Sequence, residues 1–358
     1  MTDNSPLRIA LIAPPMLPVP PPTYAGTERV VAALVDELVR CGHHVTLFAT
    51  GDSQVTAELV AIRPQSLWSE GYQGDVSSFI NVGLARAWAE HERFDVIHSH
   101  VETLGFLFAR HCPCPVVTTL HGRLDVSGIP ELIAEFDDIP LVAISESQRR
   151  WAPDANWVAT IHHGLPLERV PYATEPGSYL AFVGRVTSEK GIADSIAVAR
   201  RARMPLRIAA KVYDPHEKEH FARVVEPAVA DGTAEFLGEL PAPERDVLYA
   251  GALATLMLGP WPEPFGLVAI ESMATGTPVI GRRAGALTET VEHGVDGFLV
   301  DDLQEAELAV QQVTELDRGL IRERALERFS PARMAAEYLE TYRAVIQARR
   351  GALVMSQT

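Results

Sequence analysis

The chain has 358 residues and a formal net charge of −16, with 47% hydrophobic and 22% charged residues. This length predicts two domains, and the apolar content allows each to bury a large core and excludes a disordered chain. The acidic balance disfavours a nucleic-acid binder, which needs basic side chains to neutralise phosphates, and it disfavours docking on anionic lipid.

Short apolar runs alternate with amphipathic helical windows along the first half of the chain. Residues 7–13 read as a buried strand, and residues 27–41 read as a helix with valine and leucine at helical spacing. Further strands are predicted at residues 44–49, 94–98, 116–120, 141–144 and 157–161. Near-continuous apolar strands separated by helices are typical of a parallel sheet covered on both faces.

The same pattern starts again after residues 165–177, which are rich in proline and polar residues and read as a linker. Strands are predicted at residues 179–183, 206–210, 234–237, 254–258, 277–280 and 297–300, and a last helix at 331–348. We therefore predict an α/β fold of two doubly wound, Rossmann-like parallel-sheet domains, residues 1–166 and 167–330, facing each other across a cleft. Because ligands of such sheets bind beyond the carboxyl ends of the strands, functional residues are expected in the loops there.

The cysteines and the N-terminus bear on the compartment. Cys41, Cys112 and Cys114 lack the spacing of a zinc site or a disulfide framework, so free thiols in a reducing compartment are expected. The polar N-terminus does not resemble a signal peptide, and no apolar run reaches the roughly 18 residues that cross a bilayer. We expect a cytoplasmic protein with no integral membrane segment and no nucleic-acid partner.

The loop after the strand at residues 179–183 carries two cations between glycines. It reads Gly184-Arg185-Val-Thr-Ser-Glu-Lys190-Gly191 and leads into a helix. Backbone N–H groups and the helix dipole favour an anion at such a position, where arginine supplies a planar fork and lysine a point charge. Cations at the start of a helix oppose its dipole unless an anion is present. This loop therefore predicts a phosphate or diphosphate site rather than a solvated surface loop.

Two carboxylates follow the strand at residues 254–258. Glu263 lies in a loop, and Glu271 lies on the apolar face of a helix predicted to begin at about Phe265. A carboxylate on an apolar face is unfavourable unless it meets a partner, and sugar hydroxyls are natural partners for carboxylates and for backbone amides. Either glutamate alone would read as a helix-dipole or surface charge, whereas the whole segment points to sugar recognition.

Glu263 and Glu271 form an E-x7-E motif within Pro-Glu-Pro-Phe-Gly-Leu-Val-Ala-Ile-Glu-Ser-Met. With the preceding Gly-Arg-Val-Thr-Ser-Glu-Lys-Gly, this motif resembles the retaining glycosyltransferases of family 4, which have the two-domain GT-B fold. The segment Tyr24-Ala25-Gly26-Thr27-Glu28 is similar to that family's glycine-rich first loop, with Ala25 where a second glycine is common. The resemblance also implies that the C-terminal helix, residues 331–358, crosses back onto the N-terminal domain.

The resemblance implies a role for each site residue. Arg185 and Lys190 hold the diphosphate of a nucleotide sugar. Glu271 accepts a hydrogen bond from the ribose, and Glu263 contacts hydroxyls of the transferred sugar. His121, in Thr-Leu-His-Gly, matches a family histidine near sugar and acceptor, so catalysis is expected to use Glu263, Arg185, Lys190 and His121. The expected donor-binding residues, with the base at Gly238 and Glu239, are Gly26, Gly184, Arg185, Lys190, Lys211, Gly238, Glu239, Glu263, Phe265, Gly266, Leu267 and Glu271.

Three other patterns are weaker. His98-Ser-His100 has the spacing of a metal pair on a strand, but no third ligand is evident, and no metal site is predicted. Ser145 lacks the G-x-S-x-G setting of a hydrolase and reads as the N-cap of a helix at residues 146–151. His162 and His163 stand at the expected domain junction, where a structural role and a ligand-facing role are equally plausible.

The predicted function is transfer of a hexosyl group from a nucleotide diphosphate sugar, by family frequency a UDP sugar, to an acceptor hydroxyl with retention. The donor is a substrate, so no cofactor is expected, and the absence of a D-x-D pair in the sequence suggests that no divalent metal is needed. Acidic residues outnumber basic ones two to one in residues 1–168, which favours a soluble acceptor. A GT-B sugar phosphorylase and a non-catalytic nucleotide-sugar-binding subunit remain alternatives.

Overall fold

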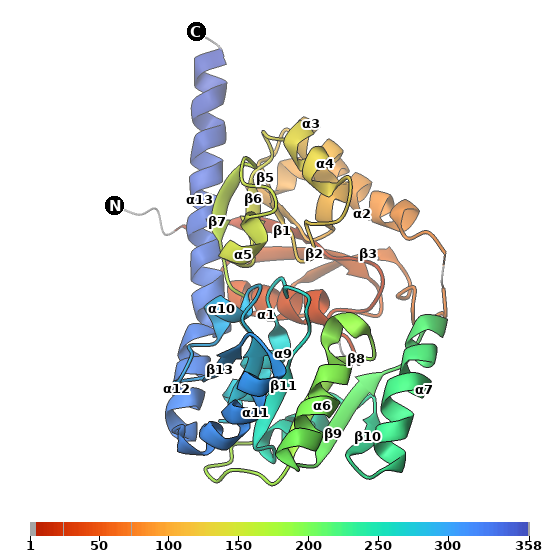
Figure 1. Ribbon diagram of the computed structural model, residues 1–358. Helices are drawn as coiled ribbons and strands as arrows, with labels where there is room; N and C mark the ends of the chain where they lie inside the picture. The colour runs from red at the N-terminus through yellow and green to blue at the C-terminus, as the bar shows by residue number, and fades with distance from the viewer. Residues whose placement is uncertain (1–4, 24, 73, 357–358) are drawn as a thin grey trace. The chain divides into compact units, whose positions relative to one another are not determined.

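The computed structural model in Figure 1 describes residues 5–23, 25–72 and 74–356, so Tyr24 of the first loop lies outside the described residues. The chain divides into two compact units. Unit 1 comprises Met1–Leu165 and Ser330–Thr358, and unit 2 comprises Pro166–Phe329. These boundaries lie within one residue of the expected domain ends. The last helix therefore belongs to the unit that contains the N-terminal half of the chain.

Unit 1 is built on a seven-stranded parallel sheet in the order β3-β2-β1-β4-β5-β6-β7. Its strands are β1 (Arg8–Ile12), β2 (His44–Thr50), β3 (Glu58–Arg63), β4 (Val96–Ser99), β5 (Val116–Thr119), β6 (Leu141–Ala143) and β7 (Trp157–Thr160). The sequence pattern does not predict the strand β3. It is an edge strand with mostly half-buried side chains, so its apolar pattern is weak.

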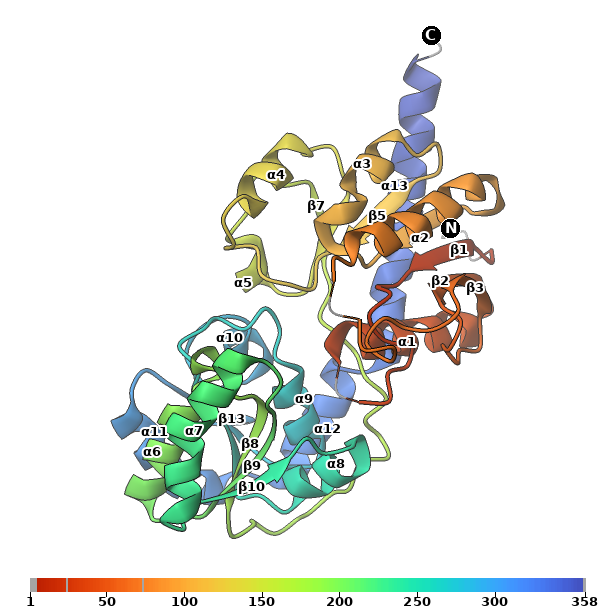
Figure 2. The same cartoon turned by 90° about the vertical axis from the view of Figure 1, so that its right-hand side faces the viewer.

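The helices of unit 1 cover this sheet. They are α1 (Gly26–Arg40), α2 (Ser77–Ala89), α3 (Phe106–His111), α4 (Ile129–Glu135), α5 (Glu146–Arg149) and α13 (Pro331–Ser356). Residues of α2 pack with β1 and β4 in one core, and α1 contacts α13 (Figure 2). The predicted N-cap at Ser145 is confirmed, because its hydroxyl accepts a hydrogen bond from the N–H of Gln148 at 3.0 Å.

Unit 2 has a six-stranded parallel sheet in the order β10-β9-β8-β11-β12-β13. Its strands are β8 (Leu180–Arg185), β9 (Leu206–Lys211), β10 (Ala234–Gly238), β11 (Ala254–Met257), β12 (Val279–Arg282) and β13 (Gly297–Val300). Its helices are α6 (Ile192–Ala202), α7 (Pro215–Ala230), α8 (Ala242–Ala250), α9 (Leu267–Ala274), α10 (Leu287–Thr290), α11 (Leu303–Gln312) and α12 (Arg318–Arg328). Figure 2 shows α6 and α7 on one face of this sheet and α8 and α9 on the other.

The strand order of unit 2 reverses direction at one place. β9 lies on one side of β8, and β11, which follows later in the chain, lies on the other. Loops leave the carboxyl ends of β8 and β11 toward opposite faces at such a switch point, and a crevice opens between them. The two sequence motifs singled out above lie at the carboxyl ends of these two strands, and Gly184 and Arg185 of the first motif are the last residues of β8 rather than loop residues.

Candidate functional site

The predicted donor-binding residues of unit 2 gather at the carboxyl edge of four neighbouring strands. Gly238 ends β10, Lys211 ends β9 and Arg185 ends β8, with Arg185 and Lys211 paired in register. Glu263 follows β11 on the other side of the switch point. The parallel sheet therefore brings together charged side chains that are separated by up to about eighty residues in the sequence.

The phosphate loop between β8 and α6 ends in a tight turn. Gly191 is the N-cap of α6 with φ of 71°, a left-handed conformation that favours glycine. A Cβ there would lie 2.3 Å from the backbone nitrogen of Gly259, so no other residue fits. The helix begins at Ile192, one residue later than the motif suggested, and Lys190 ends a 3-10 turn just before it. The turn places Lys190 beside a helix N-terminus, as the sequence predicts.

Lys190 and Glu263 form an ion pair across the switch point. The Nζ of Lys190 donates to Oε1 of Glu263 at 2.5 Å, and the two side chains are 35% and 17% exposed. The carbonyl of Glu263 accepts from the N–H of Ala286 at 2.9 Å, which ties its loop to the segment after β12. The two motifs on which the sequence prediction rests are thus in direct contact through Lys190 and Glu263.

Arg185 has two carboxylate partners that the sequence analysis missed. Its Nε donates to Oε1 of Glu217 at 2.6 Å, and its Nη2 donates to Oδ2 of Asp214 at 3.4 Å. Lys211 lies 3.9 Å from Oε2 of Glu239, so these two predicted donor residues also pair. The Asp-x-x-Glu spacing of Asp214 and Glu217 is a capping-box signal that was readable from sequence, but their partner was not.

Glu271 is almost fully buried on α9 and is held from α8. Its Oε1 lies 3.4 Å from Nη2 of Arg245, and its Oε2 accepts from the hydroxyl of Tyr249 at 3.1 Å. The sequence predicted that a carboxylate on this apolar helix face needs a partner. Arg245 and Tyr249 of the same unit are its partners. A buried carboxylate fixed in this way presents a defined acceptor to a hydroxyl placed beside it.

The helix that carries Glu271 begins later than expected. It starts at Leu267 rather than Phe265, because Gly266 adopts a left-handed conformation with φ of 89° and serves as the N-cap. Phe265 is buried and packs edge-on against Phe329 with ring centroids 6.0 Å apart. The N–H of Ala269 in the first turn of α9 donates to the carbonyl of Gly266 at 2.9 Å, and the dipole of the helix favours an anion or a hydroxyl oxygen at this end.

The remaining predicted site residues, Gly26 and His121, belong to unit 1. Gly26 starts α1, and Glu28 in the same turn is only 5% exposed, so burial raises the pKa of its carboxyl to about 7. His121 follows β5. Its Nε2 shares a hydrogen bond with Nδ1 of His100 at 2.9 Å, and its ring stacks on that of His163 with centroids 5.2 Å apart.

A chain of buried polar side chains continues from this point to the C-terminal helix. The rings of His98 and His100 lie 3.9 Å apart, and His98 bonds to the hydroxyls of Tyr342 and Thr119, each at 2.7 Å. Tyr338 bonds to the same Thr119 at 2.9 Å. His98 and His100 are therefore joined to aromatic hydroxyls and to a third histidine, and the described residues contain no cluster of three or more side chains that could hold a metal ion.

Burial keeps this histidine cluster neutral. It lowers the pKa of His121 to about 4 and lowers the pKa values of His98, His100 and His163 well below their usual range, helped by repulsion among the rings. Burial has the opposite sign for the carboxyl of Glu102, whose pKa it raises to about 7. Glu102, at φ of 53°, accepts from the N–H of His121 at 3.0 Å. No sequence signal marked this residue.

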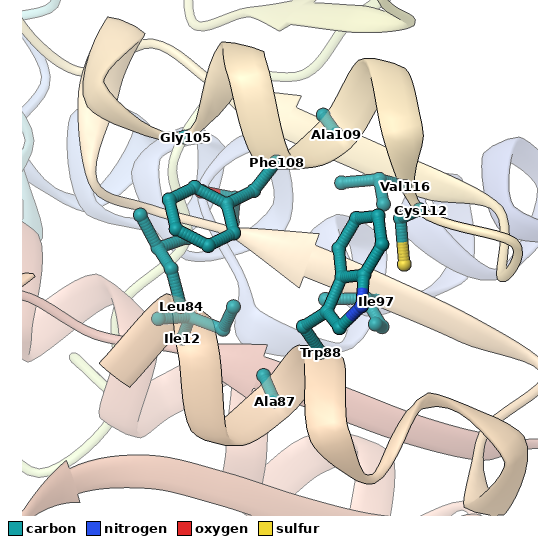
Figure 3. Close-up of a pocket in the computed structure, with 11 residues that line it drawn as sticks. Ile12, Leu84, Ala87, Trp88, Ile97, Gly105, Phe108, Ala109, Cys112 and Val116 are labelled. Atoms are coloured by element: carbon teal, nitrogen blue, oxygen red, sulfur yellow. The ribbon is translucent and has the colours of Figure 1, made fainter. Parts of the chain in front are cut away.

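Figure 3 shows a small apolar pocket in unit 1, and none of the predicted site residues lines it. It lies between α2 and α3, with the ring of Trp88 and the thiol of Cys112 on its wall. The cysteines are free thiols, as predicted. Among the described residues, no helix is both long and apolar enough to span a bilayer.

Comparison with known proteins gives matches over both halves of the chain. Residues 24–169 match the family described as Glycosyltransferase Family 4, and residues 169–325 match the one described as Glycosyl transferases group 1. The chain is 30% identical to an alpha-maltose-1-phosphate synthase of Mycolicibacterium smegmatis, over 71% of this chain and 80% of that protein. It is 24% identical to a D-inositol 3-phosphate glycosyltransferase of Pseudarthrobacter chlorophenolicus, over 97% of each.

Solved structures agree on the architecture. The structure of Anabaena HepE in complex with UDP and glucose superposes with a TM-score of 0.72 and 18% identity, over 94% of this chain and all of that one. A likeness at this level of identity shows the fold alone. With the two parallel sheets, it confirms the two-domain GT-B fold predicted from the sequence.

Proposed function

Because this chain belongs to the group 1, family 4 glycosyltransferases, we propose that it transfers a hexosyl group from a nucleoside diphosphate sugar to an acceptor hydroxyl with retention. The observation that carries this proposal is the contact of Lys190 with Glu263 at 2.5 Å. In a nucleotide sugar the diphosphate is bonded directly to the sugar, so a cation for phosphate and a carboxylate for sugar hydroxyls must lie side by side. Adjacent Arg185 and the N-termini of α6 and α9 support an anionic ligand here.

The chemistry requires stabilisation of a leaving diphosphate rather than a strong protein nucleophile. Lys190 and Arg185 offset charge on the diphosphate as the bond to the sugar breaks, and an oxygen of that diphosphate takes the proton of the attacking hydroxyl on the same face. In the structure, Lys190 is paired with Glu263, and Arg185 with Glu217 and Asp214. Donor binding therefore transfers Lys190 from Glu263 to phosphate and leaves Glu263 free to accept from sugar hydroxyls.

A screen of UDP, GDP and ADP sugars tests the proposal. Ligand stabilisation grows with the ratio of concentration to Kd, so a thermal shift ranks the donors, and hydrolysis or transfer measured by NMR gives the anomer of the product. We propose a UDP sugar, and HepE in complex with UDP and glucose supports that choice. Release of sugar 1-phosphate only with added inorganic phosphate would indicate a phosphorylase. Donor binding without turnover over a broad acceptor panel would indicate a binding subunit.

We propose that transfer needs no divalent metal, because Lys190, Arg185 and the N-terminus of α6 supply positive charge at the diphosphate. The transfer rate after exhaustive EDTA treatment, with and without added magnesium or manganese, checks this. We expect rates that agree within about twofold. A loss of more than about tenfold that metal restores, roughly 1.4 kcal/mol of barrier, would contradict the proposal.

A further inference from the structure

Arg185 is exposed at its tip yet anchored along one edge. Its side chain is 60% exposed, whereas the side chain of Glu217 that receives its Nε–H is 1% exposed. Asp214 receives a second hydrogen bond from Nη2. A long exposed arginine ordinarily samples many rotamers, and a contact of 2.6 Å to a buried carboxylate removes most of that freedom.

The carboxylate that anchors Arg185 is itself fixed by backbone. Oε2 of Glu217 accepts from the N–H of Tyr213 at 2.6 Å and from that of Asp214 at 3.3 Å. Asp214 in turn accepts from the N–H of Glu217 at 2.9 Å, which completes the capping box at the start of α7. The N-terminus of a sixteen-residue helix thus serves as a rigid support for one guanidinium.

The support leaves one edge of the guanidinium available. Five N–H groups lie in a fixed planar fork, and the two carboxylates occupy the edge formed by Nε and Nη2. The opposite edge, formed by Nη1 and the second N–H of Nη2, makes no hydrogen bond that the described residues show. That edge has the geometry of a bidentate contact to phosphate oxygens.

We propose that Glu217, with Asp214, is a positioning residue that holds Arg185 so that its free edge faces the donor diphosphate. This inference rests on the proposed function. The negative charges of Glu217 and Asp214 weaken the long-range attraction of Arg185 for an anion. A guanidinium already held in the orientation for a bidentate contact offsets that loss of affinity. Glu217 and Asp214 therefore fix the orientation of the Arg185 guanidinium as well as balancing its charge.

The test uses Glu217→Gln, which keeps the shape and one acceptor for the helix cap but turns an N–H group toward Arg185. Calorimetry with the nucleoside diphosphate that wild type binds best should show about tenfold weaker binding, while the parent nucleoside, followed by NMR, binds unchanged. Glu219→Gln on the exposed side of the same helix is the matched control and should bind as wild type does.

A double-mutant cycle with Arg185→Ala separates positioning from structure. Glu217→Gln should change diphosphate affinity less than twofold when Arg185 is already absent. The same tenfold loss in that background, or equal loss for the nucleoside, would overturn the inference. If Glu217→Gln does not fold, Arg185→Lys, which keeps the cation but lacks the anchored edge, should show the loss instead, and wild-type affinity there would overturn it. A wild-type protein that binds no nucleoside diphosphate would reject the proposed function itself.

Discussion

The candidate site of unit 2 and the histidine cluster of unit 1 solve the problem of polar side chains in opposite ways. In unit 2, Lys190 and Arg185 are partly exposed and paired with carboxylates. In unit 1, His98 and His100 are buried and His121 is half-buried, all three are neutral, and hydroxyl groups and other rings are their partners. Charge pairs that open to solvent can exchange partners with a ligand, whereas His98, His100 and Tyr342 are buried in unit 1. The catalytic role expected for the half-buried His121 stays a prediction. Variants in the two regions should therefore separate binding from stability.

The largest effect is expected from the anchor of the histidine cluster. Tyr342 is fully buried on α13 and bonds to His98, so Tyr342→Ala should lower the free energy of unfolding by roughly 3–5 kcal/mol. Four of the five tryptophans lie in unit 1, so denaturation followed by fluorescence reports on it. Nucleoside diphosphate affinity of the folded variant should stay within about twofold. A Tyr342→Ala variant that is as stable as wild type but loses donor binding would contradict the assignment of this cluster to stability.

Lys190→Ala should have the converse signature. Loss of a charge-assisted contact to phosphate is worth about 1.5–3 kcal/mol, so kcat/KM should fall by about ten- to a hundredfold. The melting temperature without donor should change little, because the ion pair with Glu263 is partly exposed. Steady-state kinetics and a thermal melt check both parts, with Lys218→Ala, at an exposed position of α7, as the control. Wild-type turnover would remove Lys190 from the site.

The two glutamates should divide the donor between them. Glu271→Gln should weaken the binding of free nucleoside diphosphate about tenfold, since it removes the charged acceptor proposed for the ribose. Glu263→Gln should spare the free nucleotide but cut sugar transfer. Glutamine rather than alanine is used at Glu271 because its amide oxygen keeps an acceptor for the buried Arg245. Equal losses of nucleotide and nucleotide-sugar affinity in both variants would contradict the division.

A fall in pH should change the stability of unit 1 through its buried titratable groups, by less than the substitutions above. Unfolding lets the buried histidines take up protons below about pH 6.5, so they make stability fall as pH falls from 7 toward 5. Glu102 and Glu28, with pKa values raised to about 7, bind protons in the folded state and oppose that trend. Glu102→Gln should therefore steepen the loss by about 1.4 kcal/mol per pH unit at most. Denaturant titrations at pH 7, 6 and 5 that run parallel to wild type would contradict this.

The sequence predicted the fold, because the fold depends on local pattern, and the roles given to the unit 2 residues stay predictions. Short, near-continuous apolar runs separated by helical segments indicate parallel strands. The motifs at the ends of β8 and β11 consist of residues that are close in sequence. The contact of Lys190 with Glu263 then follows from the strand order. The strand β3 was missed because an edge strand buries too little to show a period.

What the sequence could not give are partners chosen by tertiary packing. Glu217 meets Arg185 from 32 positions away, and Arg245 meets Glu271 from 26. Glu102 reaches the backbone of His121 from a left-handed conformation that nothing in its neighbourhood predicts. The sequence shows His100 only as half of a weak metal pair, because its hydrogen-bond partner, His121, follows a different strand 21 positions away.

A crystal structure of the protein with its UDP sugar would test the central claim most directly. We expect the diphosphate at the carboxyl edge of β8 and β11, with Lys190 and Arg185 on phosphate oxygens. Glu263 should have left Lys190 for sugar hydroxyls, while Glu217 still holds Nε of Arg185. A donor bound away from this edge, or Lys190 still paired with Glu263 beside a bound diphosphate, would contradict it.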